Sequence, residues 1–172
     1  IVTASHVVEG ASEVKVEFFA HRGMLPAEVF RLEPADPHGI AALVVEATLP
    51  DALSALTLNN SVPDSGPVKT IGFHRTLGIP WAEISGNIVG RDGKAIVFSA
   101  PVDEGNSGGP LMQGNQIIGV VTQVKGEFAY AVHSMIVQLV LESWRIDVST
   151  VTPLPIVTPT ATLIAQATPI AG

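Results

Sequence analysis

The chain has 172 residues, of which 47% are hydrophobic and 15% charged, so it can bury a sizeable core as one domain with an appendage. The net charge of -7 argues against a nucleic-acid partner, because a duplex-binding surface needs a basic footprint. Cysteine is absent, which excludes disulfides, thiolate metal sites and cysteine nucleophiles. No apolar run reaches the roughly 18 residues of a membrane-spanning helix.

Residues 1–133 alternate between short strand-like segments and turns. Residues 14–18 alternate apolar and polar side chains, as in a half-buried strand, and residues 40–45 form an apolar run that can be buried on both faces. The other predicted strands are residues 27–33, 68–73, 82–89, 95–99, 117–122 and 128–132. Eight short strands at this spacing predict an all-β barrel or sandwich.

One helix is predicted after the last strand. Ser134 is placed to cap its first turn. Helical spacing puts Ile136, Leu139, Val140 and Ser143 on one face, which we expect to be its packed face.

The chain divides near Asp147 into a domain, residues 1–147, and a Thr/Pro-rich linker or tail, residues 148–172. The 25 residues of the tail carry no charge and include six threonines and four prolines. Each proline fixes its own φ and removes a backbone donor, so regular structure is disfavoured. The alternative to a linker or stalk is a floppy chain end.

Residues 104–110 (Glu-Gly-Asn-Ser-Gly-Gly-Pro) form the first segment that can carry chemistry. Ser107 lies between glycines ahead of an apolar stretch, where its hydroxyl can be exposed and backbone N–H groups can converge beside it. An acyl-transfer enzyme needs a nucleophile next to donors that receive the developing oxyanion. The alternative is a plain glycine-rich turn between two strands.

His6, in the segment Thr-Ala-Ser-His-Val-Val, is the second candidate. A histidine can take a proton from serine at neutral pH, because its unperturbed pKa is about 6.5. The alternative is a histidine with a structural role. The other histidines, at positions 21, 38, 74 and 133, lack metal-ligand spacing, so we expect neither a metal site nor a cofactor.

Together the two segments resemble the trypsin-like serine proteases, and among them the bacterial HtrA-like branch. Residues 3–8 are similar to the family's Thr-Ala-Ala-His segment, and residues 105–111 match its nucleophile loop. Residues 117–120 and 68–73 are similar to two of its strands. The resemblance covers residues 1–145 and implies a chymotrypsin-like double β-barrel, with the active site between the barrels and the one C-terminal helix after them.

The resemblance implies a role for each matching residue. His6 would be the general base and Ser107 the nucleophile, with an oxyanion hole at Gly105, Asn106 and Ser107. The catalytic acid is the exception, because the family's acid position is occupied here by Gly39. Asp36, three residues upstream, is a weak substitute, and the adjacent His38 cannot supply a negative charge.

The start of the chain is the second departure from the family pattern. The family places its first strands before the histidine segment, and here only two residues precede that segment. We therefore expect an N-terminally truncated domain in which the first barrel is open and the second, at residues 67–133, is complete.

Substrate preference also follows from the resemblance. Trypsin-like enzymes that select Lys or Arg carry an acid six residues before the serine, and this chain has Pro101 there, which favours a small or aliphatic side chain. Thr122, Gln123 and Val124 match the strand that binds substrate backbone by β-addition. The alternative for this strand is a plain core strand.

The sequence thus predicts a serine endopeptidase that hydrolyses peptides or unfolded proteins through a Ser107 acyl-enzyme. The rival hypothesis, favoured by Gly39, is a weak or inactive protease-like domain that binds peptide in the same cleft. By family analogy we expect a location outside the cytoplasm: periplasmic, cell-surface or secreted. Neither the oligomeric state nor the natural substrate is predicted.

Overall fold

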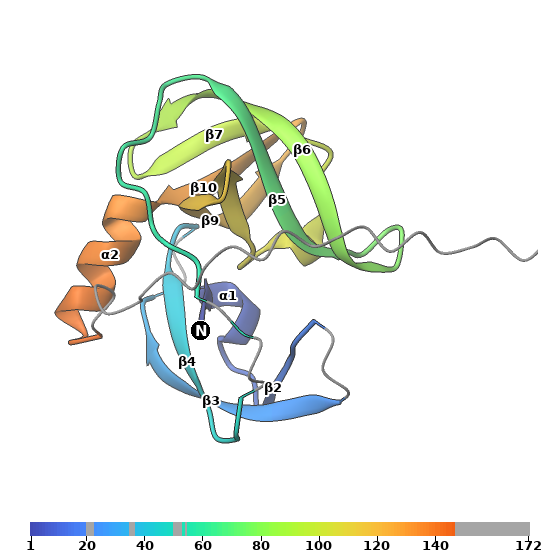
Figure 1. The fold of residues 1–172 in the computed structure, drawn as a ribbon, viewed down its shortest axis with the longest axis vertical. Helices are drawn as coiled ribbons and strands as arrows, with labels where there is room; N and C mark the ends of the chain where they lie inside the picture. Colours follow the sequence, from blue (N-terminus) through green and yellow to red (C-terminus); the bar gives the residue numbers. More distant parts are fainter. Residues whose placement is uncertain (20–22, 35–36, 50–52, 54, 147–172) are drawn as a thin grey trace, which may run out of the picture.

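The computed structural model describes residues 1–146 except 20–22, 35–36, 50–52 and 54. The described chain forms two β-structures, one above the other, with a helix beside them (Figure 1). The proposed tail at residues 148–172 lies outside the described residues.

The β-structure formed by the later part of the chain is a closed barrel of six antiparallel strands in the order β10-β7-β6-β5-β8-β9. Its strands are β5 (Gly66–His74), β6 (Ile79–Asp92), β7 (Ala95–Ser99), β8 (Pro110–Gln113), β9 (Gln116–Lys125) and β10 (Phe128–His133). Gly93 and Gly114 supply the positive φ angles, 56° and 58°, that the tight β6–β7 and β8–β9 turns require. Closure pairs every strand on both sides, as predicted for residues 67–133.

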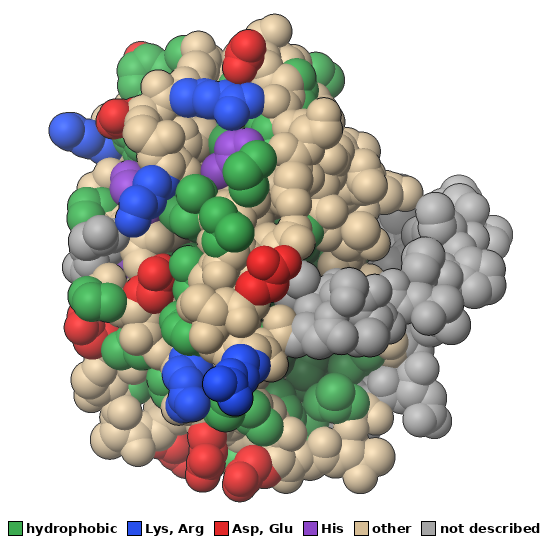
Figure 2. All heavy atoms as spheres, turned by 90° about the vertical axis from the view of Figure 1, so that its left-hand side faces the viewer, with side chains coloured by type: hydrophobic (Ala, Val, Ile, Leu, Met, Phe, Trp, Pro, Cys, Tyr) green, Lys and Arg blue, Asp and Glu red, His purple; other side chains and the backbone are tan. Residues whose placement is uncertain are grey.

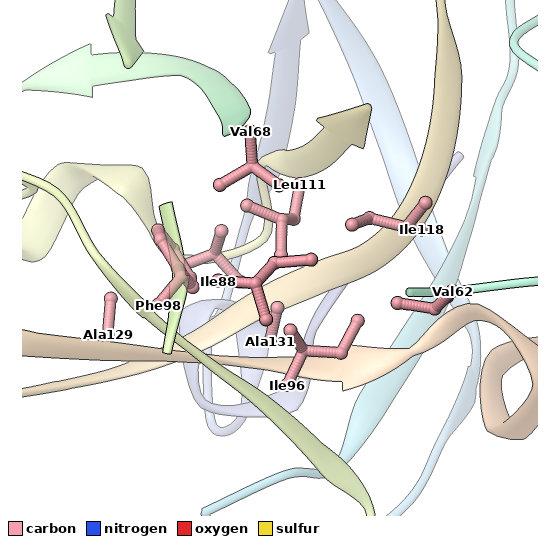
Figure 3. Close-up of a cluster of buried hydrophobic side chains, with 10 residues drawn as sticks. Val62, Val68, Ile88, Ile96, Phe98, Leu111, Ile118, Ala129 and Ala131 are labelled. Atoms are coloured by element: carbon pink, nitrogen blue, oxygen red, sulfur yellow. The ribbon is translucent and has the colours of Figure 1, made fainter. Parts of the chain in front are cut away.

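The barrel interior is filled by aliphatic side chains around one phenylalanine (Figure 3). Phe98, Ile96, Leu111 and Ile118 come from three strands of the barrel, β7, β8 and β9, and are all fully buried. On β7 the two buried side chains, Ile96 and Phe98, flank the less buried Val97, whereas β9 is buried continuously from Ile118 to Thr122.

The first β-structure is an open sheet of four antiparallel strands in the order β1-β4-β3-β2. Its strands are β1 (Val2–Ala4), β2 (Val14–Glu17), β3 (Met24–Leu32) and β4 (Ile40–Val45). The central strand β4 is mostly buried, whereas hydrophobic side chains of β3, such as Met24 and Phe30, are exposed. The predicted chymotrypsin-like architecture, with one complete and one incomplete barrel, is confirmed.

The two β-structures meet on a shared apolar cluster. Ile40 of the sheet packs with Val120 and Val132 of the barrel, and Val137 and Leu141 of the helix α2 (Ser134–Ser143) complete the cluster. The helix therefore packs against both β-structures and fixes their relative placement.

The predicted helix exists, but its cap and its packed face differ from the prediction. His133 is the N-cap, and its Nδ1 accepts a hydrogen bond from the Met135 N–H at 3.0 Å. The Ser134 hydroxyl instead donates to the Asn59 carbonyl at 2.6 Å. Leu139 is 55% exposed, because the helix turns Val137 rather than Leu139 toward the barrel.

The face that carries α2 mixes hydrophobic, acidic and basic side chains, and its basic side chains lie in several separate places (Figure 2). Among the described residues, no helix has both the length and the apolar character needed to cross a membrane.

Candidate active site

The loop that carries Ser107 is held by its own backbone and by two side chains. A 3-10 turn, Glu104–Asn106, precedes the serine, with Asp103 as its N-cap. Asn106 is fully buried: its N–H donates to the Asp103 carbonyl and its side-chain oxygen accepts from the Asp103 N–H, both at 2.9 Å. The Asp103 side chain also accepts from the Asn106 N–H, so Asp103 and Asn106 form a capping box that fixes the backbone immediately ahead of Ser107.

The glycines of the loop are required by close backbone approaches. A Cβ on Gly105 would lie 2.0 Å from the Phe73 carbonyl oxygen. Gly108 has φ 83°, and a Cβ there would lie 2.1 Å from the Thr3 hydroxyl oxygen. The serine loop is thus pressed against β5 on one side and against the histidine segment on the other.

His6 lies in a short helical turn, α1 (Ser5–Val8), that directly follows β1. Ser5 is fully buried and its N–H donates to the Gly39 carbonyl at 2.9 Å, which anchors the turn, while the His6 side chain is exposed. The contact of Gly108 with Thr3 brings the histidine segment against the serine loop.

The hydrogen bond between His6 and Ser107 stays a prediction. Within the described part of the chain, no hydrogen bond joins the two side chains. Catalytic hydrogen bonds are often long until substrate binds, so this arrangement is compatible with the pair.

Of the three residues predicted to form the oxyanion hole, only two remain candidates as backbone N–H donors. The Asn106 N–H is used within the loop, by the Asp103 carbonyl. The N–H groups of Gly105 and Ser107 remain the candidates from this segment.

The family's acid position, Gly39, has no room for a side chain. It is buried, and a Cβ there would lie 2.3 Å from the Pro34 carbonyl oxygen and 2.9 Å from the Ser5 hydroxyl oxygen. That hydroxyl is buried and forms no hydrogen bond with the described residues. Asp36, the weak substitute, lies outside the described residues.

Sequence reasoning missed a contact between His38 and Thr122. The His38 Nδ1 lies 3.1 Å from the hydroxyl oxygen of Thr122 on β9, and the His38 ring is 6.3 Å from that of Tyr130. No local sequence pattern could predict this contact, because it joins residues that are 84 positions apart in the sequence. It places a second imidazole on the strand that was predicted to bind substrate.

A second network, also missed, ties the serine loop to the β5–β6 turn. The Asp103 carboxylate accepts from the Thr76 hydroxyl, from the Thr76 N–H at 2.7 Å and from the Glu104 N–H at 2.7 Å. These bonds, led by the Thr76 hydroxyl, lower the pKa of Asp103 to about 2. His74, with its Nδ1 at 3.6 Å from the same carboxylate, adds a smaller effect.

The predicted substrate strand has an open edge. β9 pairs with β8 only as far as Val120, and β10 covers the other side of residues 121–125. Among the described residues, no strand pairs with the β8-side edge of Thr122, Gln123 and Val124. Pro101, the predicted pocket residue, is exposed in the segment between β7 and the serine loop.

A comparison with family models matches residues 1–120 to the trypsin-like peptidase domain. The chain belongs to the trypsin-like peptidase family. Among the described residues of this peptidase-family chain, no group of three or more His, Asp or Glu side chains could hold a metal ion.

Individual proteins that are similar to this chain include a curated bacterial protein and a solved structure. An uncharacterized protein of Sinorhizobium fredii, y4bJ, is 31% identical over 128 residues, which are 71% of this chain and 20% of that protein. This chain therefore spans about a fifth of the curated relative. A crystal structure of Rv3671c from M. tuberculosis, in the inactive form of its Ser343Ala mutant, has TM-score 0.67 and 22% identity, and covers 90% of this chain and 78% of that one. The likeness to Rv3671c shows the fold.

Proposed function

We propose that this domain is a serine endopeptidase of the HtrA-like kind. One observation carries the proposal: three segments that are distant in the sequence meet at Gly108. Gly108 of the serine loop contacts Thr3 of the histidine segment, and its N–H donates at 2.7 Å to the carbonyl of Val121, next to the open edge of β9. A nucleophile, a base and a backbone-binding edge are the parts that peptide hydrolysis needs.

The reaction follows from these parts. The Ser107 hydroxyl oxygen attacks the peptide carbonyl carbon while His6 takes the hydroxyl proton. The N–H groups of Gly105 and Ser107 receive the negative charge on the former carbonyl oxygen. The C–N bond then breaks as His6 gives the proton to the leaving amine. Water, deprotonated by His6, attacks the acyl-enzyme, and the proton returns to Ser107.

The substrate is an extended peptide or an unfolded protein. Its backbone would add as a strand to the open edge at Thr122, Gln123 and Val124, so affinity would come from main-chain hydrogen bonds. The side chain before the scissile bond would lie near Pro101, which carries no charge and favours small or aliphatic residues. A location outside the cytoplasm is part of the proposal, on the same family analogy.

A second function is favoured by Gly39. No carboxylate fits at this position without a backbone shift, and a triad without its acid loses about 10⁴-fold in turnover in the worked template of serine proteases. A domain that binds peptides at the β9 edge but cleaves them slowly or not at all is the alternative.

Hydrolysis and binding measured on the same peptides separate the two functions. Unstructured peptides with Ala or Val before the scissile bond should be cleaved, and Ser107→Ala and His6→Ala should each lower turnover about 10⁴-fold while peptide affinity is retained. Ser61→Ala, at an exposed serine, is the matched control and should change neither quantity. Binding without turnover in the unmodified chain would favour the peptide-binding alternative.

A further inference from the structure

The Asp103 carboxylate joins the serine loop to the turn that follows β5. One carboxylate oxygen accepts from the N–H of Thr76 at 2.7 Å and from its hydroxyl, and the other accepts from the N–H of Glu104 at 2.7 Å. The N–H of Asn106 also donates to this carboxylate. Both oxygens are therefore engaged, and the bonds to Thr76 connect positions that are 27 residues apart in the sequence.

A close backbone contact seats the same loop on the end of β5. A Cβ on Gly105 would lie 2.0 Å from the Phe73 carbonyl oxygen, so the two backbones touch. Such a contact limits how closely the loop can approach β5, but it does not stop the loop from moving away. The bonds between Asp103 and Thr76 supply that restraint, because Thr76 lies two residues beyond the end of β5.

The two candidate oxyanion donors belong to peptide groups next to these restraints. The Gly105 N–H lies between two N–H groups, those of its neighbours in the chain, that both donate to the Asp103 carboxylate. The Ser107 N–H belongs to the peptide group whose carbonyl, that of Asn106, accepts from the Gly109 N–H at 3.0 Å. Because each peptide group is planar, these bonds limit the directions in which the two donors can point.

The acceptor that holds the loop is charged. The bonds from Thr76 and Glu104 lower the pKa of Asp103 to about 2, so its carboxylate is ionised at neutral pH. Hydrogen bonds to an ionised acceptor are roughly twice as strong as those between neutral groups. The Asp103 side chain is only 20% exposed, which reduces competition from water. These bonds can therefore hold the loop against thermal motion.

We propose that Asp103 is a positioning residue for the oxyanion hole, an inference that rests on the proposed hydrolase function. Held by Thr76, its carboxylate keeps the N–H groups of Gly105 and Ser107 directed at the place where the negative charge forms. An oxyanion hole stabilises the transition state because its donors are already oriented when the charge develops. Asp103 acts through the backbone and needs no contact with the substrate.

This role predicts a loss of kcat without a loss of binding. The proposed binding edge at residues 122–124 lies on β9, whereas Asp103 joins the serine loop to the turn after β5. Loosening the loop should therefore leave the affinity for the peptide unchanged and weaken only interactions made in the transition state. A role in stability alone would change neither kcat nor affinity in the folded protein.

The test removes the bonds of Asp103 in steps. Thr76→Val deletes the hydroxyl but keeps the N–H bond, and Thr76→Ser restores the hydroxyl. We expect Thr76→Val to lower kcat about 10-fold, Asp103→Ala to lower it about 10²-fold, and Thr76→Ser to keep the parental value. Peptide affinity, measured in the Ser107→Ala background, should be the same in all of them. The parental kcat in both Thr76→Val and Asp103→Ala would overturn the proposal.

Arg75→Met is the matched control, because Arg75 lies in the same turn and also contacts the serine loop. Its ion pair with Glu104 joins side chains that are 69% and 73% exposed. Such exposed pairs contribute little, so kcat should change less than about 2-fold in Arg75→Met. A loss as large as that in Thr76→Val would overturn the assignment to Asp103. If Asp103→Ala does not fold, the variants at the exposed positions 75 and 76 still decide the question.

NMR of the backbone amides separates this inference from the proposed function. Thr76 is distant from the serine loop in the sequence, so a change at the Gly105 and Ser107 amides in Thr76→Val reports a connection through Asp103. We expect both amide signals to shift or broaden in Thr76→Val and to return in Thr76→Ser. If the unmodified chain hydrolyses no peptide, the proposed function fails while these signals still decide the positioning role. Unchanged Gly105 and Ser107 signals in Thr76→Val would overturn the inference, whether or not the protein is active.

Discussion

The closed barrel and the open sheet of this chain differ in how completely their strands are paired and their hydrophobic side chains are buried. Every barrel strand is paired on both sides around a core that includes fully buried Phe98. The sheet ends in the edge strands β1 and β2, and its Phe30 is 41% exposed. The nucleophile and the substrate edge belong to the well-packed part, whereas His6 and His38 belong to the open part. We infer that nucleophile placement is robust and that base placement depends on contacts between the two parts.

The largest expected effect is a difference between two matched phenylalanine truncations. Phe98→Ala empties a site in the barrel core and should lower the free energy of unfolding by about 3–5 kcal/mol. Phe30→Ala, on the open sheet, removes a half-exposed ring and should cost less than about 1 kcal/mol. Urea denaturation measures both. Equal losses would contradict the contrast between barrel and sheet.

Gly108→Ala should disrupt the contact between the serine loop of the barrel and the histidine segment of the sheet. Its added Cβ would meet the Thr3 hydroxyl oxygen at 2.1 Å, and its φ of 83° strains any residue with a side chain. Gly114→Ala is the matched control, since Gly114 has φ 58° and no atom within 4 Å of an added Cβ. We expect about 1–2 kcal/mol of strain in the control and a greater loss in Gly108→Ala, with cleavage lost as well.

A second change sharpens the Gly108 experiment. Thr3→Ala removes the side-chain oxygen that the new Cβ would meet, so it should restore part of the stability lost in Gly108→Ala. Additive losses in the double variant would show that the Thr3 contact is not the cause.

A smaller, pH-dependent effect is expected at the helix cap. Burial, and secondarily the charge of Arg91, lowers the pKa of His133 below its usual 6.5, so the folded state binds its proton less tightly than the unfolded state. The stabilisation is complete above pH 6.5 and is lost as the pH falls toward the folded-state pKa. The loss should not exceed the roughly 1–2 kcal/mol of a helix cap.

His133→Asn gives the comparison for this effect, because asparagine caps a helix without titrating. Urea midpoints at pH 8 and pH 5.5 should differ less in His133→Asn than in the unmodified chain. The same pH dependence in both would assign the effect to other groups.

Local patterns predicted most strands because their evidence is local. Alternating and apolar runs located eight strands within a few residues. β1 and β8 were missed: the first has only three residues, and the second begins at Pro110 directly after the serine loop. Neither offers enough alternation to be recognised.

Long-range contacts explain what sequence reasoning could not find. Ser134 has the chemistry of a helix cap, but Asn59, 75 residues away, takes its hydroxyl, so His133 caps instead. His38 was set aside because it carries no negative charge, and its bond to Thr122 exists only in the folded chain. The serine and histidine segments were found because their chemistry is concentrated in a few consecutive residues.

The central claim is that Ser107 is an activated nucleophile, and covalent labelling tests it most directly. A fluorophosphonate probe reacts with an activated serine, and mass spectrometry of the digested protein locates the adduct. We predict one adduct, on Ser107, that is lost in Ser107→Ala and slowed at least about 10³-fold in His6→Ala. No adduct on Ser107, or an adduct that forms equally fast in His6→Ala, would contradict the account.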